Sequence, residues 1–138
     1  MTLVPKSTPY EVRKAAGIWD EYFDSLSRPM QEFVNDKVWN HIRFDPYGNE
    51  SLNEPLKGLW SYNDSSNGYR IIYAVCEQCR RDRYLEVNGC DKQDCSGIPN
   101  RSVKLFACGP HPIYEEFERR NGKRRKKALG KRRQLGGR

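Results

Sequence analysis

The segment Gly68-Tyr69-Arg70-Ile71-Ile72-Tyr73-Ala74-Val75 is the part of this chain that most strongly decides its fold. Its aromatic and β-branched residues predict a strand. The polar residues 63–68 predict a hairpin-like loop before it, so residues 59–62 are expected to form a neighbouring strand. Because successive side chains of a strand point to opposite faces, Arg70 is expected on the other face from Tyr69.

Two segments before this hairpin have apolar residues at helical spacing. Thr8 and Pro9 have the order of a helix N-terminus, which predicts a first helix over residues 9–26. A second helix is expected over residues 29–42. The other expected elements are strands at residues 2–4 and 103–108 and a short last helix at residues 112–120. The predicted fold class is therefore α+β, with two N-terminal helices packed on a small antiparallel sheet.

The net charge of +7 comes from the end of the chain. Residues 121–138 contain nine Lys or Arg residues and no acidic residue, whereas residues 1–120 contain 16 basic and 18 acidic residues. We therefore expect a folded domain over residues 1–120 and a disordered basic tail over residues 121–138. A tail that only improves solubility is one alternative. A tail that binds polyanions predicts RNA contacts from Lys123, Arg124, Arg125, Lys126, Lys127, Lys131, Arg132 and Arg133.

The sequence does not indicate a membrane protein. No run of residues is long and apolar enough to span a bilayer, and the mean hydropathy is −0.94. The first residues lack the basic and apolar regions of a signal peptide. We expect a soluble, cytoplasmic protein without a membrane partner.

Residues 76–100 form a polar, cysteine-rich insertion between two expected strands. It contains two cysteine pairs, Cys76 with Cys79 and Cys90 with Cys95. Four thiolates can hold one structural Zn²⁺ ion, and a metal would stabilise a segment with few apolar residues. The alternatives are reduced thiols without a metal, or two disulfides. Cys108 ends an apolar strand and is expected to be a buried, unreactive thiol.

Charged or titratable side chains flank three of the expected strands. Glu54 and Lys57 precede the first strand of the hairpin, whereas Arg70 lies within the second. His111 and Tyr114 follow the last strand, and antiparallel pairing would bring His111 to the same side of the sheet as Glu54 and Arg70. A carboxylate base, a phosphate-binding arginine and an imidazole acid can cleave RNA without a catalytic metal. Each of these residues has an ordinary surface or packing role as its alternative.

The fragments Glu54-Pro55-Leu56-Lys57 and Gly68-Tyr69-Arg70-Ile71-Ile72-Tyr73, with His111 and Tyr114, resemble the RelE/ParE toxin superfamily. The resemblance covers about residues 1–118 without the insertion, and is greatest to RelE- and YoeB-type mRNA interferases of type II toxin–antitoxin systems. It implies that Glu54 is a general base and that Arg70 contacts the scissile phosphate. It further implies that His111 is a general acid and that Tyr114 stacks on or orients the substrate. An antitoxin partner and cleavage of mRNA in the ribosomal A site are also implied.

The chain departs from this family pattern in two ways. RelE-type toxins carry lysines on the second strand, whereas Ser61, Tyr62 and Asn63 stand here, which leaves Lys57 as the candidate RNA-contacting lysine. The cysteine-rich insertion and the basic tail are additions. Two other functions therefore stay open: a non-enzymatic gyrase inhibitor of the ParE type, and a nucleic-acid-binding module without catalysis.

Overall fold

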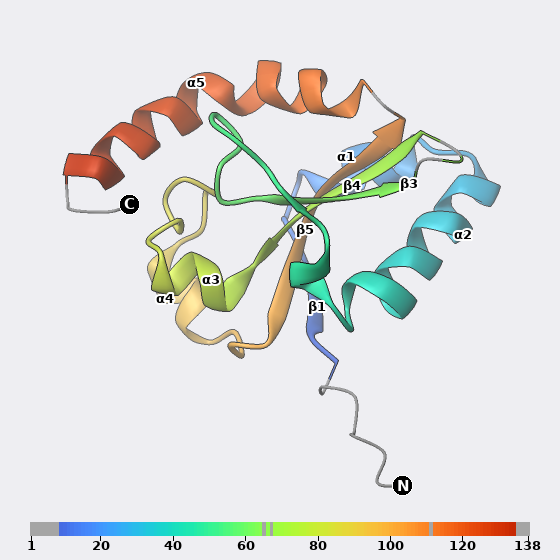
Figure 1. Cartoon of the computed structure of the whole chain (residues 1–138), viewed down its shortest axis with the longest axis horizontal. Coiled ribbons are helices and arrows are strands. Elements are labelled where there is room, and N and C mark those ends of the chain that lie inside the picture. Colours follow the sequence, from blue (N-terminus) through green and yellow to red (C-terminus); the bar gives the residue numbers. More distant parts are fainter. Residues whose placement is uncertain (1–8, 65, 67, 111, 135–138) are drawn as a thin grey trace, which may run out of the picture.

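A five-stranded mixed sheet forms the centre of the protein (Figure 1). The structure is a computed structural model that describes residues 9–64, 66, 68–110 and 112–134. The strand order is β1-β5-β4-β3-β2, in which β1 pairs with β5 in parallel and the other neighbours are antiparallel. The strands are β1 (Glu11–Lys14), β2 (Glu50–Ser51), β3 (Trp60–Asp64), β4 (Tyr69–Val75) and β5 (Ser102–Pro110).

Helices surround this sheet (Figure 1). They are α1 (Trp19–Asp24), α2 (Arg28–Lys37), α3 (Cys76–Arg81), α4 (Lys92–Ser96) and α5 (Ile113–Gln134). Helix α2 continues into a π-helical turn at Val38–Ile42, and a 3-10 turn follows at Pro46–Gly48. None of the described helices is long and apolar enough to cross a membrane.

The central hairpin forms as predicted, but β3 ends at Asp64, two residues later than its prediction. Strand β4 spans the predicted residues, and β3 pairs with it from Trp60 opposite Tyr73 to Asp64 opposite Tyr69. Strand β4 is buried except at Arg70, which is half-buried. The second predicted helix corresponds to α2 and its π-helical turn, whose buried Val34, Val38 and Ile42 recur every four residues.

The segment before α1 differs from its prediction. Residues 11–14 form a strand, so the predicted helix over residues 9–26 is wrong up to residue 18. Main-chain hydrogen bonds explain the difference, because Glu11 N donates to Arg101 O and Ala15 N donates to Leu105 O, each at 2.8 Å. Gly17, with a φ of +73°, then turns the chain into α1. The sheet is consequently mixed, not wholly antiparallel as predicted, and the strand predicted at residues 2–4 lies outside the described residues.

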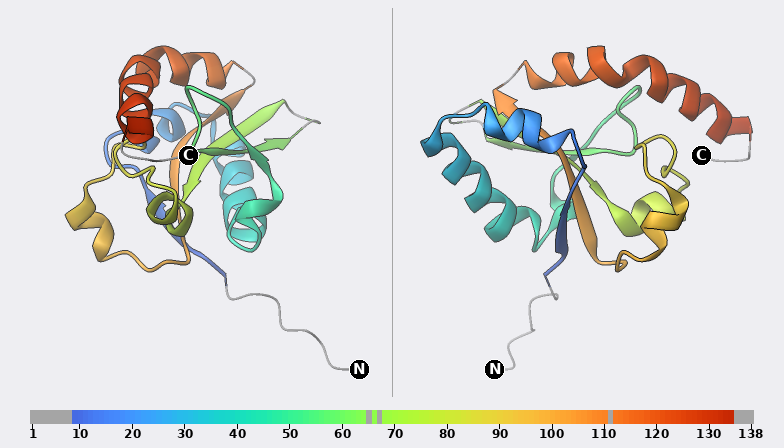
Figure 2. Two further views of the ribbon diagram at one scale, coloured as in Figure 1. Left: turned by 60° about the vertical axis from the view of Figure 1, so that its left-hand side comes forward. Right: turned by 180° about the vertical axis from the view of Figure 1, so that it is seen from behind.

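The C-terminal helix also differs from its prediction. Helix α5 continues to Gln134, so the disordered tail predicted from residue 121 is wrong for residues 121–134, and the helix crosses the domain boundary predicted at residue 120. Its buried positions recur at helical spacing, but Arg125 and Arg132 are among them. Figure 2 shows α5 running along the outside of the domain, from the end of β5 to the cysteine-rich insertion.

The first turns of α5 pack on α1 and β5. The ring of Phe117 lies 6.4 Å from that of Tyr22 in α1 and 6.3 Å from that of Phe106 in β5. Arg120 pairs with Glu21 of α1 at 2.7 Å. These contacts hold the start of α5, and therefore Tyr114, against the sheet.

Candidate active site

Strand pairing brings four polar residues to one face of the sheet near its β2 edge. Glu50 of β2 lies opposite Ser61 of β3, and Asn63 of β3 lies opposite Arg70 of β4. Directly opposed residues share a face, and so do residues two apart on one strand. Glu50, Ser61, Asn63 and Arg70 are therefore neighbours on the same face, although they come from three strands.

Tyr114, in the first turn of α5, contacts all four of these residues through its hydroxyl group. Arg70 Nη1 donates to Tyr114 Oη at 3.1 Å, and the hydroxyl lies 2.5 Å from Ser61 Oγ and 2.8 Å from Asn63 Oδ1. Glu50 Oε1 lies 3.4 Å from the same oxygen and accepts a hydrogen bond from Asn63 Nδ2 at 3.1 Å. We name these five residues the Arg70 cluster.

The guanidinium of Arg70 contacts the ring of Tyr114 as well as its hydroxyl group. It lies 4.6 Å from the centroid of the Tyr114 ring, which is cation–π contact distance. Its buried Nε finds no acceptor among the described residues. A guanidinium presents several N–H donors in a planar fork that matches two oxygens of a phosphate. The cluster therefore places a guanidinium and a carboxylate each within hydrogen-bonding distance of the same phenol oxygen.

The structure does not bring Glu54 and Lys57 into the Arg70 cluster. Glu54 pairs with Arg133 of α5 at 3.0 Å. Both Glu54 and Lys57 line a separate cavity of about 520 Å³, beside Trp60 and Tyr84, and no member of the Arg70 cluster lines it. His111 lies outside the described residues, so its predicted position beside Arg70 stays a prediction.

The basic residues predicted to contact RNA fall into two groups. Arg125 and Arg132 are buried, so the prediction of a direct RNA contact does not hold for these two side chains. Arg125 donates to main-chain oxygens of Pro55, Lys57 and Val87, and its burial lowers its pKa to about 10. The exposed group is Lys123, Arg124, Lys126, Lys127, Lys131 and Arg133.

Arg132 has a packing role in α5. Its guanidinium lies 4.2 Å from the centroid of the Tyr84 ring, and its Nε donates to Asp82 O at 2.8 Å. Both partners belong to the cysteine-rich insertion. The basic end of the chain is therefore partly internal structure and partly an exposed helical surface.

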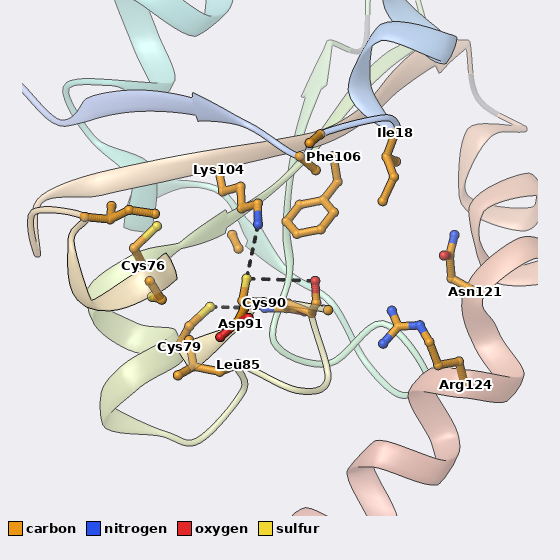
Figure 3. Close-up of a pocket in the computed structure, with 17 residues that line it drawn as sticks. Ile18, Cys76, Cys79, Leu85, Cys90, Asp91, Lys104, Phe106, Asn121 and Arg124 are labelled. Atoms are coloured by element: carbon orange, nitrogen blue, oxygen red, sulfur yellow. Dashed lines mark hydrogen bonds between the residues drawn. The ribbon is translucent and has the colours of Figure 1, made fainter. Parts of the chain in front are cut away.

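The four cysteines of the insertion line one cavity of about 490 Å³ (Figure 3). All are free thiols, so the disulfide alternative is not present in this structure. Among the described residues, no three His, Cys, Asp or Glu side chains are already arranged to hold a metal ion. Cys108 is buried as predicted, and burial raises its pKa to about 12, which disfavours a reactive thiolate.

Three members of the Arg70 cluster did not emerge from the sequence: Glu50, Ser61 and Asn63. The sequence pattern placed Asn63 in the hairpin loop, whereas β3 extends to Asp64 and sets Asn63 opposite Arg70. The role of Glu50 could not be predicted from the sequence, because β2 has only two residues and shows no alternating pattern.

The overall fold is similar to a solved toxin–antitoxin structure. A chain of the toxin–antitoxin complex RelBE2 from Mycobacterium tuberculosis matches with a TM-score of 0.52 and 15% identity, over 75% of this chain and 99% of that chain. The isolated RelE toxin from E. coli matches with a TM-score of 0.45 and 16% identity, over 80% of this chain and 97% of that chain. No protein-family model matches the sequence, and no curated protein is significantly similar to it. The first of these two structural similarities shows that the chain has a RelE-like fold.

Proposed function

We propose that this protein is a toxin-type endoribonuclease that cleaves mRNA, with the Arg70 cluster as its active site. The observation that carries the proposal is the contact between Arg70 Nη1 and Tyr114 Oη at 3.1 Å. These two residues belong to separate sequence fragments, both of which resemble RelE- and YoeB-type toxins. Their meeting on one face of a RelE-like fold supports a shared role in catalysis.

The proposed reaction needs no catalytic metal. The 2′-oxygen of a ribose attacks the adjacent phosphorus, and the bond from phosphorus to the 5′-oxygen of the next nucleotide breaks. Arg70 binds the phosphate and stabilises the charge that develops on the phosphorane. His111 donates a proton to the departing 5′-oxygen, since an unperturbed imidazole titrates near neutral pH. The products are a 2′,3′-cyclic phosphate, later opened to a 3′-phosphate, and a free 5′-hydroxyl.

Glu50 is the carboxylate that we propose as the general base. A general base must reach the proton that it removes, and Glu50 Oε1 lies 3.4 Å from the Tyr114 hydroxyl that also contacts Arg70. Glu54, which the family resemblance favours for this role, is instead paired with Arg133. Tyr114 orients the phosphate or stacks on a base that has left the RNA helix.

The proposed substrate is mRNA in the A site of the ribosome, with no cofactor for the chemical step. The exposed lysines and arginines of α5, and Lys57, would contact RNA phosphates. A cytoplasmic antitoxin protein is the proposed partner, because the RelBE2 neighbour is a toxin–antitoxin complex.

Mapping mRNA 5′ ends in a reconstituted translation reaction tests this function. Wild type is compared with Arg70→Ala and with a matched control, Arg28→Ala, whose side chain is exposed on α2. We expect cuts at a fixed position within A-site codons for wild type and Arg28→Ala, and none for Arg70→Ala. An absence of cuts from folded wild-type protein would overturn the proposal, and assays of gyrase inhibition and RNA binding would then test the two alternatives.

A further inference from the structure

The four thiols of the insertion come from three segments that fold around one cavity. Helix α3 supplies Cys76 and Cys79, one helical turn apart, and α4 supplies Cys95. Cys90 follows Gly89, whose φ of +72° turns the chain. Figure 3 shows Cys76, Cys79 and Cys90 on the same side of the cavity as Lys104. The fold therefore brings the two cysteine pairs, which are separate in the sequence, to one cavity.

Three of the four sulfur atoms accept hydrogen bonds from nitrogen donors. Asn88 Nδ2 donates to Cys79 Sγ at 3.1 Å, and Lys104 Nζ donates to Cys90 Sγ at 3.3 Å (Figure 3). Arg80 Nε donates to Cys95 Sγ at 3.3 Å. A neutral thiol is a weak acceptor, whereas a thiolate that binds a metal is regularly stabilised by such donors around it. Two of the donors are cations, which offset the net negative charge of four thiolates around Zn²⁺.

The thiols are also buried close together. Cys76, Cys79 and Cys95 are 5%, 2% and 4% exposed. All four insertion cysteines line the same cavity. Thiolates in this cavity would repel one another without a cation between them. A divalent ion with affinity for sulfur removes that repulsion, and Zn²⁺ is the ion that takes four Cys ligands in structural sites.

We propose that Cys76, Cys79, Cys90 and Cys95 bind one structural Zn²⁺ ion. Since these side chains are not yet closed into a metal-binding arrangement, the ion would draw them together, and the cavity of about 490 Å³ gives room for that movement. The insertion has little regular structure besides two short helices, so metal binding would supply much of its stability.

A hydrogen-bonded path joins the proposed metal site to α5. Asn88 donates to Cys79 Sγ and to Gly58 O, and its Oδ1 accepts from Arg125 at 2.7 Å. Arg125 in turn donates to Pro55 O. Loss of the ion would therefore loosen the loop at residues 54–58 as well as the insertion. The cavity shares no lining residue with the Arg70 cluster, so the metal has a structural role in this proposal.

Metal content of the purified full chain tests the proposal. We expect one zinc ion per chain, by elemental analysis, in wild type and in Cys108→Ser, because Cys108 is buried in β5 and does not line the cavity. The double variant Cys79→Ser/Cys95→Ser should retain almost none. If the double variant does not fold, wild type is stripped with a chelator and titrated with Co²⁺, which should give the intense visible absorption of tetrahedral thiolate coordination.

Two results would overturn the metal site. One is folded wild-type protein without zinc, whose four insertion thiols react as free groups and whose Co²⁺ spectrum shows no thiolate coordination. The other is unchanged zinc content in the folded double variant. Either result would leave RNA cleavage by the Arg70 cluster unaffected, so the two proposals fail independently.

Discussion

The guanidinium of Arg125, in the middle of α5, donates a hydrogen bond of 2.8 Å to the main-chain oxygen of Pro55. It also donates to Lys57 O at 2.7 Å and to Val87 O at 2.9 Å, so one buried cation satisfies carbonyl groups of two separate loops. The loop at residues 54–58 and the cysteine-rich insertion thus depend on a side chain that composition alone assigns to a flexible tail.

Replacing Arg125 with Met should destabilise the protein by about 3 kcal/mol, because buried carbonyl groups lose their donors. Urea unfolding measures this change. The matched control is Arg124→Met, on the adjacent exposed position, which should cost less than about 0.5 kcal/mol. Equal unfolding midpoints for the two variants would contradict the structural role of Arg125.

Replacing Tyr114 with Phe isolates the role of its hydroxyl group. The ring keeps its contact with the Arg70 guanidinium, but the hydrogen bonds to Ser61 and Asn63 are lost. We expect the single-turnover rate of RNA cleavage to fall by about 100-fold, with RNA affinity little changed. Tyr62→Phe, on the alternate position of β3, is the control and should cleave at the wild-type rate. A wild-type rate for Tyr114→Phe would exclude the hydroxyl from catalysis.

Glu50 and Glu54 can be distinguished by paired substitutions to Gln, which keep side-chain shape and remove the charge. Glu50→Gln should lower the cleavage rate by about 100-fold or more, the usual scale for loss of a general base. Glu54→Gln should change it by a few-fold at most, because Glu54 contacts Arg133 and not the cluster. The opposite order of effects would return the base role to Glu54.

The central hairpin could be predicted because its pattern is local. Alternation of side chains defines β4, so Arg70 has its expected place, whereas β3 ends two residues later than predicted, at Asp64. Parallel pairing of β1 with β5 could not be predicted, since it joins Glu11 to Ser102 across most of the chain. Hydrogen bonds to β5 outweigh the helical spacing of apolar residues before α1, and only the tertiary structure contains that information.

The candidate site was predictable only in part, for a related reason. Arg70 and Tyr114 lie in sequence fragments that resemble the toxin superfamily. Glu50, which contacts Tyr114, lies in a two-residue strand that has no periodic pattern to predict it. The sequence predicted disorder instead of helix for residues 121–134, because Arg125 and Arg132 occupy positions where a packed helix normally has apolar residues. Their cost of burial is offset by main-chain acceptors on other segments, which no local pattern reveals.

Gly58 is required by both its backbone conformation and its surroundings. Its φ is +99°, and a Cβ atom there would lie 2.8 Å from Cδ1 of Tyr84. Gly58→Ala should therefore cost about 2 kcal/mol or more in thermal or urea unfolding. Gly68→Ala provides the comparison, because φ is +66° but no described atom lies within 4 Å of the added methyl group. A cost of about 1 kcal/mol is expected there. Equal losses of stability in the two variants would mean that the Tyr84 ring moves away from the added methyl group without an energetic cost.

The exposed lysines of α5 should determine the salt dependence of RNA binding. Neutralising Lys123, Lys126 and Lys127 with Gln removes three contacts from one helix surface, so the slope of log K against log salt should become less negative by about 2 for single-stranded RNA. The control carries the same change in net charge at scattered exposed positions, Lys14→Gln, Arg28→Gln and Lys92→Gln. A contact surface on α5 predicts that only the first triple variant changes the slope, whereas a general charge effect would change it equally in both.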